Sequence, residues 1–247
     1  MIKTFTVKGK LIAFLALFTL LLYAQGSFLP RALFFSFCGA AAAESLFFFL
    51  KKQKFSFPSS SAISALIVGL VIAGDEPWWV IFLSSLAAIS SKYLIRFRKK
   101  HIFNPAAFGI FFVFILFKAN TQWSGTFLWQ ILVPAGIYFA YQVRKIGLLA
   151  GYFAVSFLLF GLQSLVNNSA PSGIFGYFSY FYIFIMLIEP KTTPVKNFAK
   201  VFFGAAAACW IFIFVQARAG FDAELAALLL MNLAVPFLNM IPERRKK

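Results

Sequence analysis

The sequence predicts an all-α polytopic membrane protein of about ten transmembrane helices. Hydrophobic residues make up 62% of the 247 residues, charged residues make up 12%, and the mean hydropathy is +0.85. A soluble domain of this size has no need for so much apolar side chain. Apolar runs of roughly 17–25 residues, the length that crosses a bilayer, recur along the chain. The connections between the runs are short, so we expect a single integral membrane domain over residues 1–247.

The ten expected segments follow one another with short polar or charged connections. The first of them follows Lys3, Lys8 and Lys10 and ends near Gly26, a pattern that also resembles a cleavable signal peptide. An even number of helices favours its retention as a membrane helix. The segments span residues 11–28, 32–50, 60–74, 77–95, 103–117, 127–143, 146–163, 174–188, 198–216 and 223–241.

The basic residues predict the orientation of these helices. The net charge is +16, and the chain holds 23 Lys and Arg residues. With a cytoplasmic N-terminus, all of them except Arg31, Lys118 and Arg218 fall on the cytoplasmic side. This is the positive-inside pattern, and it places both termini in the cytoplasm. We therefore expect the basic residues to set the orientation in the membrane and to contact membrane lipid. We expect no binding of nucleic acid.

Ten helices divide into two sets of five, over about residues 1–118 and 119–247. An odd number of helices in each half makes the halves inverted relative to one another, as in many transporters. Short segments bounded by proline recur at corresponding places in the two halves. The short third segment begins after Pro58, and the short eighth ends at Glu189-Pro190. Such interrupted segments favour a site near the middle of the membrane.

One stretch between the fourth and fifth segments organises the first half. A helix is expected to end in the basic cluster Arg96–Lys100, and the next apolar run starts at Phe103-Asn104-Pro105. Asn is a favoured helix N-cap, and Pro fits the first helical turn. The helix start offers free N–H groups and a positive dipole to an anionic or electron-rich ligand. The alternative is an ordinary capped helix start.

Few charged residues lie within the apolar segments, so each is a candidate. Glu44 lies mid-way along the second segment, and Lys92 lies one turn before the basic cluster. A carboxylate inside the membrane is costly and indicates function, here an ion or proton path. The alternative for Glu44 is a structural pairing with Lys92 or with a buried hydroxyl. Lys92 can also extend its ammonium toward the membrane surface.

Several chemistries are excluded by composition. His101 is the only histidine, and Cys38 and Cys209 are isolated, so we expect no metal site. The sequence holds no phosphate-binding loop and no dinucleotide fingerprint. No catalytic residue is predicted. The sequence leaves open whether the protein belongs to an enzyme, and at most it predicts an electron-transfer subunit without catalysis of its own.

A resemblance to a known family rests on short motifs in the predicted order. They are Pro77-Trp78-Trp79, Ser91-Lys92-Tyr93, Phe103-Asn104-Pro105-Ala106, the run Met186 to Pro194 with its Glu-Pro-Lys-Thr-Thr, and the last helix around Asn232 and Pro236. Together they resemble the family that contains the D subunit of the Rnf electron-transport complex and the B subunit of the Na⁺-translocating NADH:quinone reductase. The resemblance implies ten helices in two inverted halves, akin to urea transporters.

The resemblance also implies electron transport through membrane-bound flavin, coupled to ion movement. We expect the flavin contacts among the residues of these motifs, namely Phe103, Asn104, Pro105, Glu189, Thr192, Thr193 and Asn232. Members of the family attach FMN to a Thr in a Ser-Gly-Ala-Thr-like motif after the fifth helix. Here the corresponding run is Ser124-Gly125-Thr126, which lacks the Ala and lies directly before an apolar helix. We therefore expect a non-covalent flavin, either FMN or riboflavin.

Two functions follow for the chain. The first is a membrane subunit of a flavin-linked electron-transport system in the inner (plasma) membrane, with redox partner subunits. The alternative is a transporter or channel for flavin or another small solute, on a urea-transporter-like fold.

Overall fold

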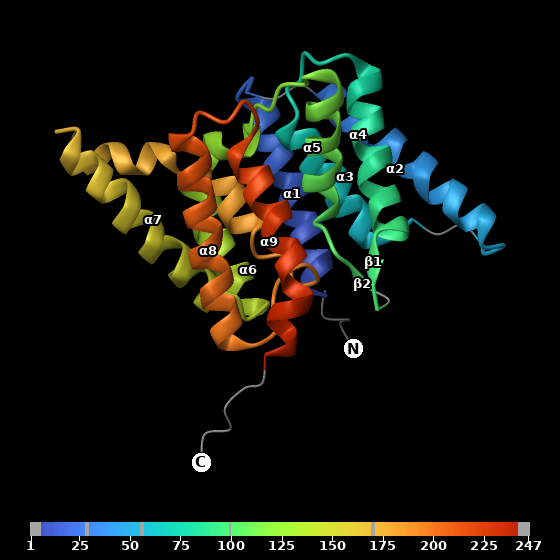
Figure 1. The fold of residues 1–247 in the computed structure, drawn as a ribbon. Helices are drawn as coiled ribbons and strands as arrows, with labels where there is room; N and C mark the ends of the chain where they lie inside the picture. The colour runs from blue at the N-terminus through green and yellow to red at the C-terminus, as the bar shows by residue number, and fades with distance from the viewer. Residues whose placement is uncertain (1–5, 28–29, 55–56, 99, 169–170, 242–247) are drawn as a thin grey trace, which may run out of the picture. The chain divides into compact units, whose positions relative to one another are not determined.

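The computed structural model describes residues 6–27, 30–54, 57–98, 100–168 and 171–241, and these are almost entirely helical (Figure 1). Within these ranges there are nine α-helices, one two-stranded hairpin and three short segments of 3₁₀ or π-helix. The chain forms two compact units, residues 1–132 and residues 133–247. The boundary between the units lies inside a helix.

Unit 1 contains five helices and the hairpin. Helix α2 packs against α3 and α4, α4 packs against α5, and α1 packs against α3. Glycines allow the closest approaches, since a Cβ on Gly39 would lie 2.2 Å from the Phe82 carbonyl oxygen. A Cβ on Gly109 would lie 2.1 Å from the Ser84 carbonyl oxygen. The elements are α1 (Val7–Ala24), α2 (Pro30–Leu50), α3 (Ser59–Val71), α4 (Trp78–Leu94), β1 (Arg96–Phe97), β2 (Lys100–His101), α5 (Pro105–Phe117) and η1 (Ser124–Leu128).

Unit 2 is also built by helices packed in succession. Helix α7 packs against α8, and α8 packs against α9, while the long segment between α7 and α8 carries η2 and η3 in place of a regular helix. A Cβ on Gly151 would lie 2.2 Å from the Val201 carbonyl oxygen, and one on Gly204 would lie 2.0 Å from that of Leu148. The elements are α6 (Trp129–Gln142), which begins in unit 1, α7 (Ile146–Val166), η2 (Pro171–Tyr177), η3 (Tyr182–Met186), α8 (Asn197–Gln216) and α9 (Ala223–Met240).

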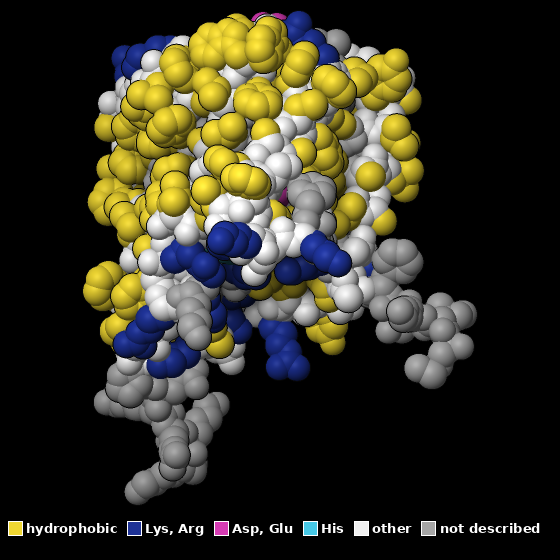
Figure 2. Space-filling view, turned by 90° about the vertical axis from the view of Figure 1, so that its right-hand side faces the viewer, with side chains coloured by type: hydrophobic (Ala, Val, Ile, Leu, Met, Phe, Trp, Pro, Cys, Tyr) yellow, Lys and Arg dark blue, Asp and Glu magenta, His cyan; other side chains and the backbone are white. Residues whose placement is uncertain are grey.

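Five of the described helices are long and apolar enough to cross a membrane, namely α1, α2, α7, α8 and α9. Three shorter apolar helices, α3, α4 and α5, accompany them. Hydrophobic side chains cover much of the face shown in Figure 2, and Lys and Arg side chains gather below this apolar surface and at its upper edge. The class of polytopic helical membrane protein is therefore confirmed. The count of ten helices and the inverted halves stay predictions.

The eighth expected segment, residues 174–188, differs from the expected regular helix. The structure has a 3₁₀ helix over Pro171–Tyr177 and a π-helix over Tyr182–Met186 instead. Gly173 and Gly176 lower the helix propensity of the first part. The π-helix ends just before Glu189-Pro190, and π-turns of this kind are frequent at functional sites.

Candidate functional site

Unit 1 holds a buried charge cluster centred on Glu44 of α2, whose side chain is 0% exposed. Its Oε1 accepts hydrogen bonds from Lys92 Nζ at 2.6 Å and from Ser61 Oγ, and its Oε2 accepts one from Tyr93 OH at 2.5 Å. Lys92 Nζ also donates to Ser61 Oγ at 2.6 Å. Three helices, α2, α3 and α4, thus meet at one carboxylate.

Further contacts extend the cluster around the ring of Tyr93. The ring of Tyr93 stacks on that of Phe47, with centroids 4.4 Å apart, and Lys51 Nζ lies 4.2 Å from the Tyr93 ring centroid. The side chain of Lys92, in the last turn of α4, is 11% exposed, whereas that of Glu44 is fully buried. The alternative interpretation of Glu44, a structural pairing with Lys92 or with a buried hydroxyl, agrees with the structure, which has both contacts. Whether the cluster also carries ions or protons stays a prediction.

Asn104 begins α5 as the sequence predicted. Its Oδ1 accepts a hydrogen bond from Ala107 N at 3.0 Å, Pro105 follows as the first helical residue, and Asn104 is 1% exposed. The Phe103 ring stacks on that of Phe108, with centroids 5.5 Å apart. The N-cap is confirmed. A flavin contact at Phe103, Asn104 and Pro105 stays a prediction.

In unit 2 the structure brings together the other four predicted residues. The loop after the π-helix turns back on itself, because Thr193 Oγ1 donates to the Glu189 carbonyl at 2.7 Å. Thr192 Oγ1 lies 3.4 Å from Glu189 Oε2. From α9, Asn232 Nδ2 donates to the Thr192 carbonyl at 2.9 Å. Thr192, Thr193 and Asn232 are buried, so this loop carries a compact set of hydroxyl, amide and carboxylate groups.

Two buried lysines beneath the same loop were missed as site residues from the sequence. Lys145 is 4% exposed and donates from Nζ to the Pro194 carbonyl at 2.6 Å. Lys200 is 8% exposed and donates from Nζ to Asn197 Oδ1 at 3.0 Å. Burial, and then the charge of Lys200, lower the pKa of Lys145 from its ordinary 10.5 to about 8. Lys200 had a usable signal, since it is a charged residue within an apolar segment, as Glu44 is.

The shortened Ser124-Gly125-Thr126 run forms the start of η1 in unit 1. Ser124 is 2% exposed, and Thr126 Oγ1 is buried with no hydrogen-bond partner among the described residues.

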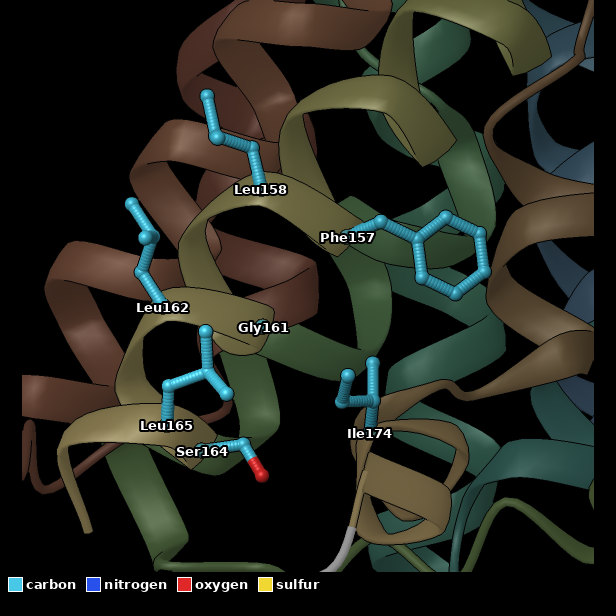
Figure 3. A pocket seen from close by; sticks show the side chains of 7 residues that line it. All are labelled: Phe157, Leu158, Gly161, Leu162, Ser164, Leu165 and Ile174. Carbon is cyan, nitrogen blue, oxygen red and sulfur yellow. The ribbon is translucent and has the colours of Figure 1, made fainter. Parts of the chain in front are cut away.

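An apolar groove of about 320 Å³ lies on unit 2 between α7 and η2 (Figure 3). It holds one polar side chain, Ser164, and none of the predicted site residues. In a membrane such a surface suits a lipid chain. It is lined by Phe157, Leu158, Gly161, Leu162, Ser164, Leu165 and Ile174.

Metal chemistry finds no support in the part of the chain that the structure describes. No group of three or more His, Cys, Asp or Glu side chains there is arranged to hold a metal ion. Cys38 and Cys209 are free thiols.

Comparison with known proteins places the chain in a family. Residues 6–146, more than half of the chain, match the model of the NQR2, RnfD, RnfE family. Among curated proteins, the chain is 39% identical over 70 residues to the D subunit of the ion-translocating oxidoreductase complex of Buchnera aphidicola subsp. Schizaphis graminum (strain Sg). That match covers 28% of this chain and 20% of the relative, so the chain spans about a fifth of the relative's length. The match to the family model over residues 6–146 nevertheless shows that the chain belongs to the NQR2, RnfD, RnfE family.

Proposed function

We propose that the protein is a membrane subunit of a flavin-linked electron-transport system coupled to ion movement. The observation that carries the proposal is the family match, which spans all the described residues of unit 1. The curated relative is a subunit of an ion-translocating oxidoreductase complex. In this proposal the chain lies in the plasma membrane with both termini in the cytoplasm, contacts lipid, and works with redox partner subunits.

The ion step is assigned to the cluster around Glu44 and Lys92. Both oxygens of the carboxylate already accept hydrogen bonds from protein donors, and the ammonium supplies the positive charge. An ionisable pair kept inside a membrane helix bundle is expensive to bury, which favours a functional use. The partly exposed Lys92 gives this pair a route toward the cytoplasmic end of α4.

The flavin is assigned to non-covalent contacts, and each unit offers candidate residues of its own. An isoalloxazine ring needs apolar walls and a few polar contacts. In unit 2, the loop with Glu189 and Thr192, together with Asn232, offers the polar groups. In unit 1, Phe103 beside the Asn104 cap offers an aromatic face. The burial of Thr126 Oγ1 supports a flavin that is not attached by a phosphoester.

The test is purification of the full chain from native membranes, with measurement of flavin absorption and of its reduction by co-purified partners. We expect close to one flavin per chain, released into the supernatant by acid precipitation. Thr193→Val and Asn232→Leu are expected to lower the flavin content. The matched control is Thr4→Val, a threonine near the N-terminus and far in sequence from both predicted contact regions.

The competing function is a transporter or channel for flavin or another small solute. Flux of that solute into liposomes containing the protein alone, with no bound flavin reduced by a partner, would favour it. Retained flavin in both the Thr193→Val and the Asn232→Leu variant would refute the assignment of the unit 2 residues while leaving the subunit role intact.

A further inference from the structure

The C-terminal ends of α2 and α4 meet in unit 1. Lys51, the residue after α2, places its ammonium 4.2 Å from the ring centroid of Tyr93 near the end of α4. The hairpin β1–β2 follows α4, and at its base Ile102 N donates to the Ile95 carbonyl at 3.2 Å. The end of α2 and the hairpin therefore adjoin one another.

The exposed charge at this place is positive, and the carboxylates of unit 1 lie elsewhere. Glu44 is buried in its ion pair. Asp75 and Glu76 precede α4, whose 17 residues span about 25 Å. That length is about three Debye lengths at physiological ionic strength, so these two carboxylates do not neutralise the hairpin end. The exposed basic residues, which we call the basic patch, are Lys51, Lys52, Lys54, Arg96, Arg98 and Lys100.

The basic patch begins where the apolar surface of the helices ends. Phe49 and Leu50 close α2 with 79% and 63% of their surface exposed, and Leu94 closes α4 with 72% exposed. In a membrane, large apolar side chains as exposed as these contact lipid. A basic residue follows within two positions of each helix end, which places the patch at the depth of the lipid headgroups. Figure 2 shows Lys and Arg side chains gathered below an apolar surface.

The geometry of Lys51 and Arg98 suits these two cations to bind an anion. Lys51 lies over the Tyr93 ring, and the Arg98 guanidinium lies 5.5 Å from the Phe97 ring centroid. A cation on an aromatic face keeps its charge and its N–H groups for an anion. Arg98 also has a φ of 47°, where a hairpin turn favours Asn or Gly. An arginine at this position is costly for the turn, which points to a use of its side chain.

We propose that the basic patch binds the headgroup of an anionic phospholipid. The phosphate oxygens accept from Lys51 and Arg98, and the acyl chains pack on Leu50 and Leu94. A single lipid molecule supplies both the negative group and the apolar chain that this surface requires. An acidic protein would match the basic side chains, but it would not cover apolar residues that lie in the hydrocarbon. The site fixes the charge and the place of the bound lipid, and it does not depend on the electron-transport role.

The test measures lipid retention by the full chain in detergent, with native mass spectrometry. Phosphatidylglycerol is compared with phosphatidylcholine of the same acyl chains, so that the net charge of the headgroup is the main difference. The wild type is expected to prefer phosphatidylglycerol about tenfold or more. Lys51→Met and Arg98→Asn are each expected to lower this preference about fivefold, the effect of one basic side chain near an anionic headgroup.

The matched control is Lys118→Met, which removes one exposed positive charge at the far end of α5. The 13 residues of α5 span about 20 Å, so this variant is expected to change the preference less than about twofold. Arg98→Asn also separates binding from folding. Asparagine tolerates the φ of 47°, so this variant should unfold at the wild-type temperature or above it.

Equal retention of the two lipids by the wild type would overturn the proposal. An equal loss in Lys118→Met and in the two patch variants would also overturn it, because the preference would then follow net charge alone. An acidic partner subunit that both patch variants lose, while they keep phosphatidylglycerol, would assign the patch to a protein instead. Selective retention of phosphatidylglycerol would support the site even in a protein that holds no flavin, so this test and that of the proposed function can fail separately.

Discussion

Both units bury lysine side chains, but they neutralise them differently. In unit 1 the ammonium of Lys92 meets the Glu44 carboxylate at 2.6 Å, and two hydroxyl groups complete the cluster. In unit 2 the ammonium groups of Lys145 and Lys200 meet only neutral oxygens within the described residues. Unit 1 therefore contains the counter-charge of its buried lysine, whereas the two buried lysines of unit 2 donate to neutral oxygens. The comparison separates a buried ion pair shared by three helices from two buried ammonium groups that are held by neutral partners.

The largest effect is expected from Glu44→Ala. The substitution leaves the Lys92 ammonium buried without its carboxylate and should lower the free energy of unfolding by about 3–5 kcal/mol. Chemical denaturation in lipid-detergent micelles measures it. The double variant Glu44→Leu with Lys92→Met removes both charges and should recover much of the loss. A loss below about 1 kcal/mol in Glu44→Ala would mean that the pair is not a stabilising contact.

A somewhat smaller loss is expected from Gly204→Ala in unit 2. The added Cβ would lie 2.0 Å from the Leu148 carbonyl oxygen, so α7 and α8 must separate. Overpacking of this kind costs about 1–3 kcal/mol. Gly173→Ala is the control, because a Cβ there meets nothing within 4 Å. Equal unfolding temperatures for the two variants would contradict the close contact between α7 and α8.

The next effect is expected in the pH dependence of stability, to which the buried Lys145 of unit 2 should contribute. The pKa of Lys145 is about 8 in the folded protein against an ordinary 10.5, so the unfolded chain binds more protons between these values. The free energy of unfolding should therefore rise with pH across this window, by at most about 3 kcal/mol. The penalty is fully present below pH 8. Lys145→Met should abolish the rise, and an unchanged rise in that variant would assign it to another group.

The smallest effect is expected from Asn104→Ala in unit 1. Loss of the N-cap hydrogen bond to Ala107 should cost about 1 kcal/mol of stability. Asn104→Asp keeps a capping oxygen and should keep the stability. If Asn104 also contacts flavin, the Ala variant will lose more flavin than its stability loss explains. A parallel loss of both would make the residue a structural cap alone.

The sequence was most informative where the signal is local. Apolar length predicted the membrane class, and the Asn104-Pro105 pair predicted the start of α5 to the residue. The placement of Glu44 inside an apolar run predicted a partner, and Lys92 was named as one. Ser61 and Tyr93 could not be chosen, because they are 17 and 49 residues from Glu44 and many other polar residues were available.

The unit 2 site was harder to predict for the same physical reason. Thr192, Thr193 and Asn232 were marked by resemblance, and the structure shows that a loop and a helix bring them together. Lys145 looked like one of many basic residues in a connecting turn, and only the packing of α7 against α8 buries it beside Lys200. Propensity likewise gave no warning of the π-helix over Tyr182–Met186, all five residues of which are buried.

The most direct test of the proposed function compares intact masses of the purified protein under native and denaturing conditions. The account predicts that the native spectrum carries the mass of one flavin and that the denatured spectrum shows the bare polypeptide. A denatured mass raised by one FMN and mapped to Thr126 would contradict the non-covalent assignment. Absence of flavin from both spectra, in protein purified together with its partners, would contradict the electron-transport role itself.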